Sequence, residues 1–146
     1  MPILTSNIII NLRLLGVLML CIASTGCSSF FFQPHKQHYR DPGKIGLAFE
    51  DVYFPTNDNL KLHGWFLPAQ GEVKGTVLFL HGNAENISTH IGSVYWLPAR
   101  GFNVFLPDYR GYGKSEGAPS LAGSMADIES ALAYVLQHKS LHFLNE

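Results

Sequence analysis

Two stretches decide the fold of this chain: residues 76–84, TVLFLHGNA, and residues 102–117, FNVFLPDYRGYGKSEG. Each begins with a continuous apolar run of strand length, which is typical of a strand buried on both faces of a parallel sheet. Polar and glycine-rich residues follow each run. Active sites of open α/β sheets lie at the carboxyl ends of the strands. The two stretches therefore predict a pair of neighbouring functional loops.

The elements around these stretches predict the rest of the architecture. Residues 50–55 and 60–67 predict two strands, and the turn cluster between them makes a hairpin. A helix is predicted after the first stretch, because apolar residues there recur at helical spacing: Ile87, Ile91, Val94 and Tyr95. A second helix is predicted after the second stretch, with an apolar face made of Leu121, Met125, Ile128, Leu132 and Val135. A hairpin followed by strand, helix, strand and helix predicts an α/β sandwich with a mostly parallel sheet.

The N-terminal 27 residues predict targeting rather than fold. Arg13 precedes an apolar run over residues 14–23, and small residues lead to Cys27, the order found in a secretory signal. A run of this length is too short to span a bilayer, which takes about 20 residues. Gly26-Cys27 resembles the cleavage site of bacterial lipoproteins, so we expect lipidation at Cys27 and a place in the bacterial cell envelope, facing the periplasm or the outside. An uncleaved signal anchor and a soluble secreted product are the alternatives.

Residues 28–47 predict a polar linker, and residues 48–146 predict one folded domain. His35 and His38 could serve as metal ligands, but no third ligand lies near them in the sequence, so they are interpreted as solvated linker histidines. We accordingly expect no metal and no cofactor. The chain of 146 residues is 47% hydrophobic and 14% charged, which suits a single core. A net charge of −1 offers no basic surface for nucleic acid.

The two decisive stretches resemble the conserved loops of the α/β-hydrolase superfamily, in its membrane-anchored esterase, lipase or serine aminopeptidase branch. The resemblance implies that the first loop is the oxyanion-hole loop, made of His81, Gly82, Asn83 and Ala84. The backbone N–H of Asn83 would point at the developing oxyanion, and one such donor contributes about 3 kcal/mol to catalysis. His81 is expected to brace the loop, because the catalytic histidine of the family lies near the C-terminus.

The second loop resembles the D-x-R-G-x-G-x-S segment of the same superfamily, which implies an architectural role for Asp108, Arg110, Gly111, Gly113 and Ser115. Ser115 also satisfies G-x-S-x-G, but the nucleophile elbow needs a sharp turn from strand directly into helix, and Gly117-Ala118-Pro119 follows instead. Gly113-Lys114-Ser115 imitates the end of a phosphate-binding loop. Asp108 stands where that motif needs its first glycine, so we do not expect nucleotide binding.

The resemblance implies a serine hydrolase that acts on a small-molecule ester, lipid or peptide substrate through an acyl-enzyme. In the family the nucleophile, the acid and the histidine all follow the segment matched here. The chain is therefore expected to be an N-terminal fragment that stops before the nucleophile elbow and is inactive. The alternatives are a non-catalytic, membrane-tethered pseudoenzyme or binding module and, less favoured, a P-loop nucleotide binder.

Overall fold

The computed structural model of the chain describes residues 31–142. By its contacts the chain divides between residues 31 and 32, and the sheets and helices described below belong to the second unit. The predicted targeting segment, with Cys27, lies outside the described residues. Among the helices of the described part, none is long and apolar enough to cross a membrane.

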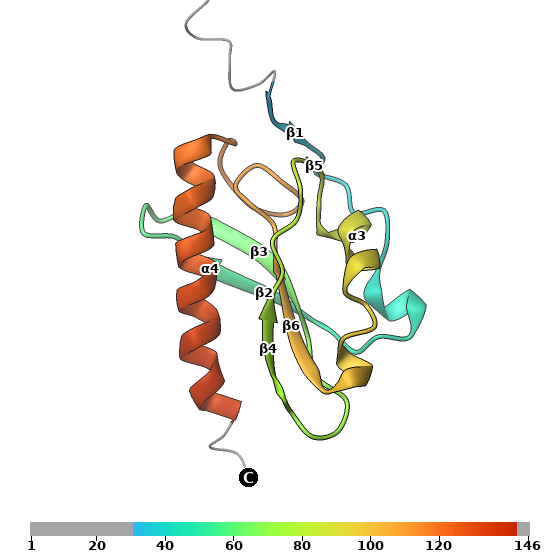
Figure 1. Ribbon diagram of the computed structural model, residues 1–146. Coiled ribbons are helices and arrows are strands. Elements are labelled where there is room, and N and C mark those ends of the chain that lie inside the picture. Colours follow the sequence, from blue (N-terminus) through green and yellow to red (C-terminus); the bar gives the residue numbers. More distant parts are fainter. Residues whose placement is uncertain (1–30, 143–146) are drawn as a thin grey trace, which may run out of the picture. The chain divides into compact units, whose positions relative to one another are not determined.

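A four-stranded mixed sheet in the order β2-β3-β6-β4 forms the centre of the second unit (Figure 1). Its strands are β2 (Glu50–Pro55), β3 (Lys61–Leu67), β4 (Gly75–Leu78) and β6 (Phe102–Pro107). β2 and β3 form the predicted antiparallel hairpin, and β3 also pairs antiparallel with β6. β4 runs parallel to β6, so the two apolar runs do form a parallel pair. The predicted α/β class is confirmed.

Strand β6 is covered on both faces, which explains its continuous apolar sequence. Successive side chains of a strand point to opposite faces of the sheet. Val104 and Leu106 belong to the core cluster on one face, Phe105 belongs to the cluster on the other, and all three are fully buried. β4 lies at the edge of the sheet that the described strands form.

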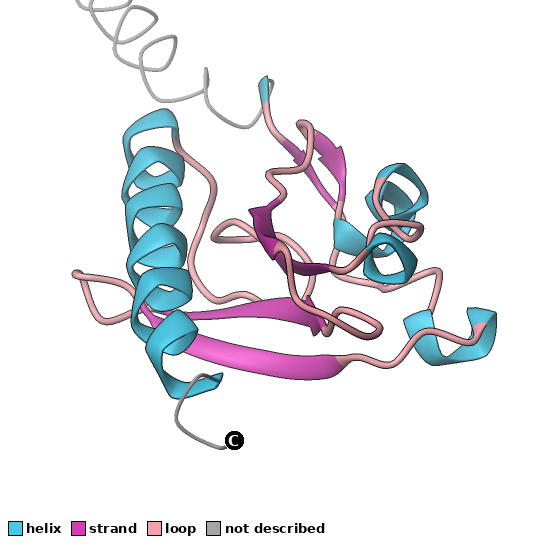
Figure 2. Ribbon diagram, turned by 60° about the horizontal axis from the view of Figure 1, so that its bottom comes forward, coloured by secondary structure: helices cyan, strands magenta, loops and turns pink. Residues whose placement is uncertain are grey.

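Helices lie on both faces of this sheet (Figure 2). Helix α4 (Leu121–His142) covers one face through Ala131 and Val135. Three short segments cover the other: α3 (Ile87–His90) and the 3-10 turns η2 (Ile91–Ser93) and η3 (Pro98–Arg100).

The prediction of one continuous helix between the two decisive stretches is wrong, because the structure has one α-helical turn followed by 3-10 turns. Ile87, Ile91 and Val94 are buried as predicted, but the helix breaks after one turn and Tyr95 is half exposed. Gly92 lies within the segment and weakens helix propensity. Pro98 cannot continue a helix from the preceding turn, so the chain goes on in 3-10 turns.

The predicted apolar face of α4 is wrong for three of its five residues. Val135 is buried and Ile128 is half-buried, whereas Leu121, Met125 and Leu132 are exposed. The face turned toward the domain instead carries small and polar residues, with Gly123 against the Arg110 side chain and Asp127 bonded to it. A buried charge needs a partner of opposite charge. Here the pairing of Arg110 with Asp127 decides which side of α4 faces the domain, and that side differs from the one that apolar spacing predicted.

The segment predicted as a linker packs against the domain. Strand β1 (Gln33–Pro34) pairs parallel with β5 (Ala84–Glu85) in a separate two-stranded sheet. A 3-10 turn, η1 (Pro42–Ile45), follows and is capped by Asp41. The interpretation of solvated linker histidines holds for the exposed His35 and is wrong for His38, whose side chain is 14% exposed.

The two faces of α4 predict opposite results for two single substitutions. Val135→Ala should lower the free energy of unfolding by about 1–3 kcal/mol, because it removes buried methyl groups. Leu132→Ala, a larger truncation on the exposed face, should change it by no more than about 0.5 kcal/mol. Urea unfolding of the 146-residue chain measures both. A Leu132→Ala loss as large as that of Val135→Ala would contradict this placement of the helix.

Candidate functional site

Two loops meet beyond the carboxyl ends of β4 and β6, as the sequence predicted. The first continues β4 through residues 79–86, and the second continues β6 through residues 108–117. They are joined directly, because the Tyr109 hydroxyl donates to the His81 carbonyl at 3.3 Å. Asp108 also accepts the backbone N–H of Ile87 at 2.9 Å, which fixes the start of α3.

His81 is buried inside this junction. Its ring lies against the rings of Tyr109 and Tyr112, with centroids 4.6 and 5.2 Å away, and stacks on His90 at 5.4 Å. Nδ1 lies 2.7 Å from the Gly82 carbonyl, so in the neutral ring Nδ1 carries the proton. Burial lowers the pKa of His81, and the nearby carboxylate of Asp108 opposes that shift only in part. These contacts place His81 as a buried brace of its own loop.

The exposed tip of the first loop is held from behind by a buried tyrosine. Gly82, Asn83 and Ala84 are exposed, whereas Tyr112 is 1% exposed. The Tyr112 hydroxyl lies 2.6 Å from the Asn83 carbonyl and 2.9 Å from its side-chain Oδ1, and its single proton can be donated to either. The tip is thus positioned by the second loop while it faces outward. Nothing in the local sequence pointed to Tyr112.

Asp108 of the second loop is fully buried and is bonded through both carboxylate oxygens. Its Oδ1 accepts the Ile87 N–H, and its Oδ2 lies 3.2 Å from His38 Nε2. Burial alone would raise the pKa of Asp108, but the hydrogen bonds from His38 and the Ile87 N–H, together with the nearby His63 ring, outweigh it and hold the pKa below its usual value. The group is therefore a buried carboxylate.

Arg110 ties three parts of the fold together. Its guanidinium binds Asp127 of α4 at 2.7 Å and Asp58 of the hairpin turn at 2.9 Å. Its backbone N–H also donates to Asp127, at 2.8 Å. Hydrogen bonding to Asp127, with a further contribution from Asp58, raises the pKa of Arg110 above its already high value. Both carboxylates were missed from the sequence, where they read as a turn residue and an ordinary helix residue.

Ser115 is placed as a structural residue and not as a nucleophile. It is 1% exposed, donates its hydroxyl proton to the Asp108 carbonyl at 2.7 Å, and accepts the His63 N–H at 2.9 Å. Lys114 Nζ binds Asp51 at 3.0 Å, away from any cradle of backbone donors. Gly113 has a φ of +46°, and a Cβ there would lie 1.9 Å from Asp108 Oδ2, so this close approach requires glycine.

Known proteins share this segment of fold. The family described as serine aminopeptidase, S33, matches residues 71–142, which include both loops. YfhR of Escherichia coli K12 is 42% identical over 116 residues, covering 77% of this chain and 39% of that protein. The Arabidopsis thaliana α/β hydrolase domain-containing protein WAV2 is 38% identical over 96 residues, covering 64% of this chain and 31% of that protein. The chain therefore spans well under half the length of these relatives.

Solved structures agree with the sequence relatives. The Pyrococcus furiosus esterase Pf2001 superposes with a TM-score of 0.60 at 23% identity, covering 71% of this chain and 40% of that one. The α/β hydrolase GrgF from Penicillium sp. sh18 gives 0.51 at 26% identity, covering 60% and 32%. The sheet, its two loops and these likenesses define part of an α/β-hydrolase fold. The chain belongs to the α/β-hydrolase superfamily, and within it the matching family is the one described as serine aminopeptidase.

The buried titratable groups predict a loss of stability in acid. The pKa of His81 is lowered in the folded state, so the unfolded chain takes up protons first and stability falls as the pH drops below about 6.5. The lowered pKa of Asp108 adds a second loss as the pH falls below about 4. Melting temperatures between pH 7 and pH 3 should therefore decrease steadily.

The contribution of His81 can be separated by substitution. His81→Gln should flatten the decrease in melting temperature between pH 7 and pH 5, whatever its effect on the value at pH 7, because the titrating group is gone. His35→Gln, at an exposed histidine, is the matched control and should leave the slope unchanged. An unaltered slope in His81→Gln would show that another group causes the acid sensitivity.

Proposed function

We propose that the protein is a serine hydrolase that cleaves esters, lipids or small amides through an acyl-enzyme, with residues 81–84 as its oxyanion-hole loop. The observation that carries this proposal is the placement of that loop. It follows β4 at the carboxyl end of the parallel pair, its tip is exposed, and the buried Tyr112 hydroxyl holds Asn83 from behind. Donors that are fixed before the reaction are the ones that stabilise an oxyanion well.

The nucleophile of this reaction is not among the residues placed at the site. Ser115 is the serine with the G-x-S-x-G spacing, and its hydroxyl is buried with both a donated and an accepted hydrogen bond. In the superfamily the nucleophile, acid and histidine come later in the chain order. We therefore assign the oxyanion-hole half of the site to this segment, and we expect these 146 residues alone not to turn over substrate.

A chimera tests the assignment. Residues 32–138, fused to the portion of Escherichia coli YfhR that follows the aligned region, should react with a fluorophosphonate probe and hydrolyse a short-chain p-nitrophenyl ester. In that chimera Asn83→Pro, which removes the backbone N–H, should lower kcat about 100- to 1,000-fold. The unfused chain should not be labelled.

Asn83→Ala is the matched control for the chimera, because it keeps the backbone N–H and removes only the side-chain amide, whose oxygen lies near Tyr112. It should retain kcat within a few-fold. Circular dichroism and melting temperature establish that each variant is folded. A folded chimera that is neither labelled nor active would favour the alternative function, a non-catalytic binding module. Labelling of the unfused chain that Ser115→Ala abolishes would contradict the structural role of Ser115.

We also propose that the protein is held at the bacterial cell envelope by lipid on Cys27. The support comes from the sequence: an apolar run over residues 14–23 leads to Gly26-Cys27, the order of a lipoprotein signal. An acyl chain gains about 0.8 kcal/mol per buried CH₂, and stable anchoring takes more than one chain.

Fractionation of cells that express the full chain tests this tether. Cys27→Ser should abolish incorporation of labelled palmitate and move the protein from the membrane fraction to the soluble fraction. Cys21→Ser is the control, because that cysteine lies inside the apolar run and should leave both readouts unchanged. If Cys27→Ser stays at the membrane without label, an uncleaved signal anchor holds the protein instead.

A further inference from the structure

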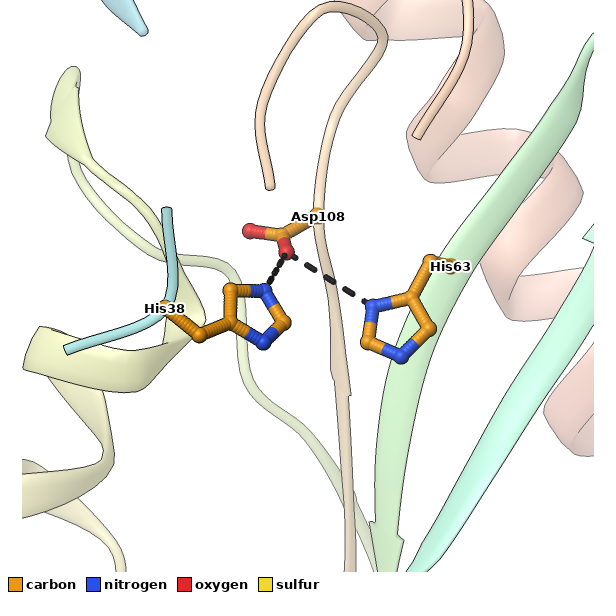
Figure 3. Close-up of side chains that lie close together, drawn as sticks. All are labelled: His38, His63 and Asp108. Carbon is orange, nitrogen blue, oxygen red and sulfur yellow. Dashed lines mark hydrogen bonds and ion pairs between the residues drawn. The ribbon is translucent and has the colours of Figure 1, made fainter. Parts of the chain in front are cut away.

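Two histidines and an aspartate from distant parts of the chain converge beside the second loop (Figure 3). His38 comes from the segment before η1, His63 from β3, and Asp108 from the end of β6. One ligand atom from each lies within 4.8 Å of the other two. Asp108 Oδ2 is 3.2 Å from His38 Nε2 and 3.8 Å from His63 Nδ1.

The His63 ring is fully buried, and one of its nitrogens has no hydrogen-bond partner among the described residues. Its Nε2 bonds Asp51 Oδ1, and a carboxylate can only accept, so Nε2 carries the proton. Nδ1 of the neutral ring then carries a lone pair, and this atom faces the buried carboxylate of Asp108. Two acceptors turned toward each other in a dry interior are unfavourable unless a cation lies between them.

We propose that His38, His63 and Asp108 bind a zinc ion. Two imidazoles and a carboxylate are a common zinc donor set, and bonds of about 2.0–2.1 Å in a tetrahedral site place ligand atoms about 3.3 Å apart. The two distances to Asp108 Oδ2, 3.2 and 3.8 Å, bracket that value, and the two imidazole nitrogens lie within 4.8 Å of each other, so a movement of the rings toward each other completes the geometry. A Cβ at Gly113 would lie 1.9 Å from Asp108 Oδ2 and 2.7 Å from His38 Nε2, so only glycine fits beside these two ligand atoms.

The partners of the ligands support a metal site. Histidine ligands of metals usually donate their second ring N–H to a carboxylate, as His63 does to Asp51, and carboxylate ligands are themselves hydrogen-bonded. Asp108 uses its other oxygen, Oδ1, to accept the Ile87 N–H. His38 is 14% exposed at its side chain, which leaves a route for the ion and a place for water as fourth ligand.

Such an ion would fasten the segment around His38 to the ends of β3 and β6. His38 contacts the carboxylate of Asp108 directly, although the two residues lie 70 positions apart in the sequence. The role is structural and does not depend on the proposed hydrolase reaction. A ligand at free concentration L that binds only the folded chain stabilises it by RT ln(1 + L/Kd), so zinc should raise the melting temperature.

Zinc titration of the chelator-treated full chain tests the site. We expect one ion per chain, a higher melting temperature, and the visible absorption of tetrahedral Co²⁺ when cobalt replaces zinc. His38→Gln and His63→Gln should each weaken zinc binding by at least about 100-fold, and Asp51→Asn by about 10- to 100-fold through the orientation of His63. His35→Gln is the matched control, because His35 is exposed and lies in the same segment.

The comparison among variants decides the outcome. Zinc bound equally by His38→Gln, Asp51→Asn and the control would be adventitious and would overturn the proposal, as would a wild-type chain that binds none. If His63→Gln does not fold, His38→Gln and Asp51→Asn carry the test, because His38 lies outside the four-stranded sheet and the Asp51 side chain is 41% exposed.

Discussion

The buried carboxylate of Asp108 is the constraint on which the site depends. A charge at a fully buried position must be satisfied by hydrogen bonds or by opposite charge. Asp108 obtains these from the Ile87 N–H and from His38, while its backbone N–H donates to His63 O and its carbonyl accepts the Ser115 hydroxyl. The first loop, the second loop and strand β3 are therefore positioned around one residue.

A second buried charge decides how the long helix lies. Arg110 needs carboxylate partners, and it finds Asp127 on α4 and Asp58 on the hairpin turn. Turning Asp127 inward leaves the apolar residues Leu121 and Met125 exposed in the described part of the chain. Polar pairing at the loop thus outweighs apolar spacing along the helix, because an unpaired buried charge costs far more than an exposed methyl group.

These bonds separate the buried residues that hold the two loops in position from the exposed tip that we propose takes part in the reaction. His81, Tyr112 and Ser115 are buried and make contacts within the two loops, so they support the site from behind. The tip of the first loop faces outward, where a substrate carbonyl could approach. Rigid support behind an exposed backbone is what oxyanion stabilisation needs, since donors that reorganise during the reaction lose much of their effect.

The sequence by itself determined the strands and the two loops. Apolar runs, turn clusters and glycines are local signals, and they predicted β2, β3 and β6 almost to the residue. The architectural roles of Asp108 and Ser115 were implied only by the family resemblance. The tertiary structure alone decided which side of α4 faces the domain, and it brought His38 beside Asp108 across 70 residues. The orientation of α4 and the contact of His38 with Asp108 both depend on residues that are distant in the chain. Local sequence periodicity therefore cannot predict which residues pair with a buried charge.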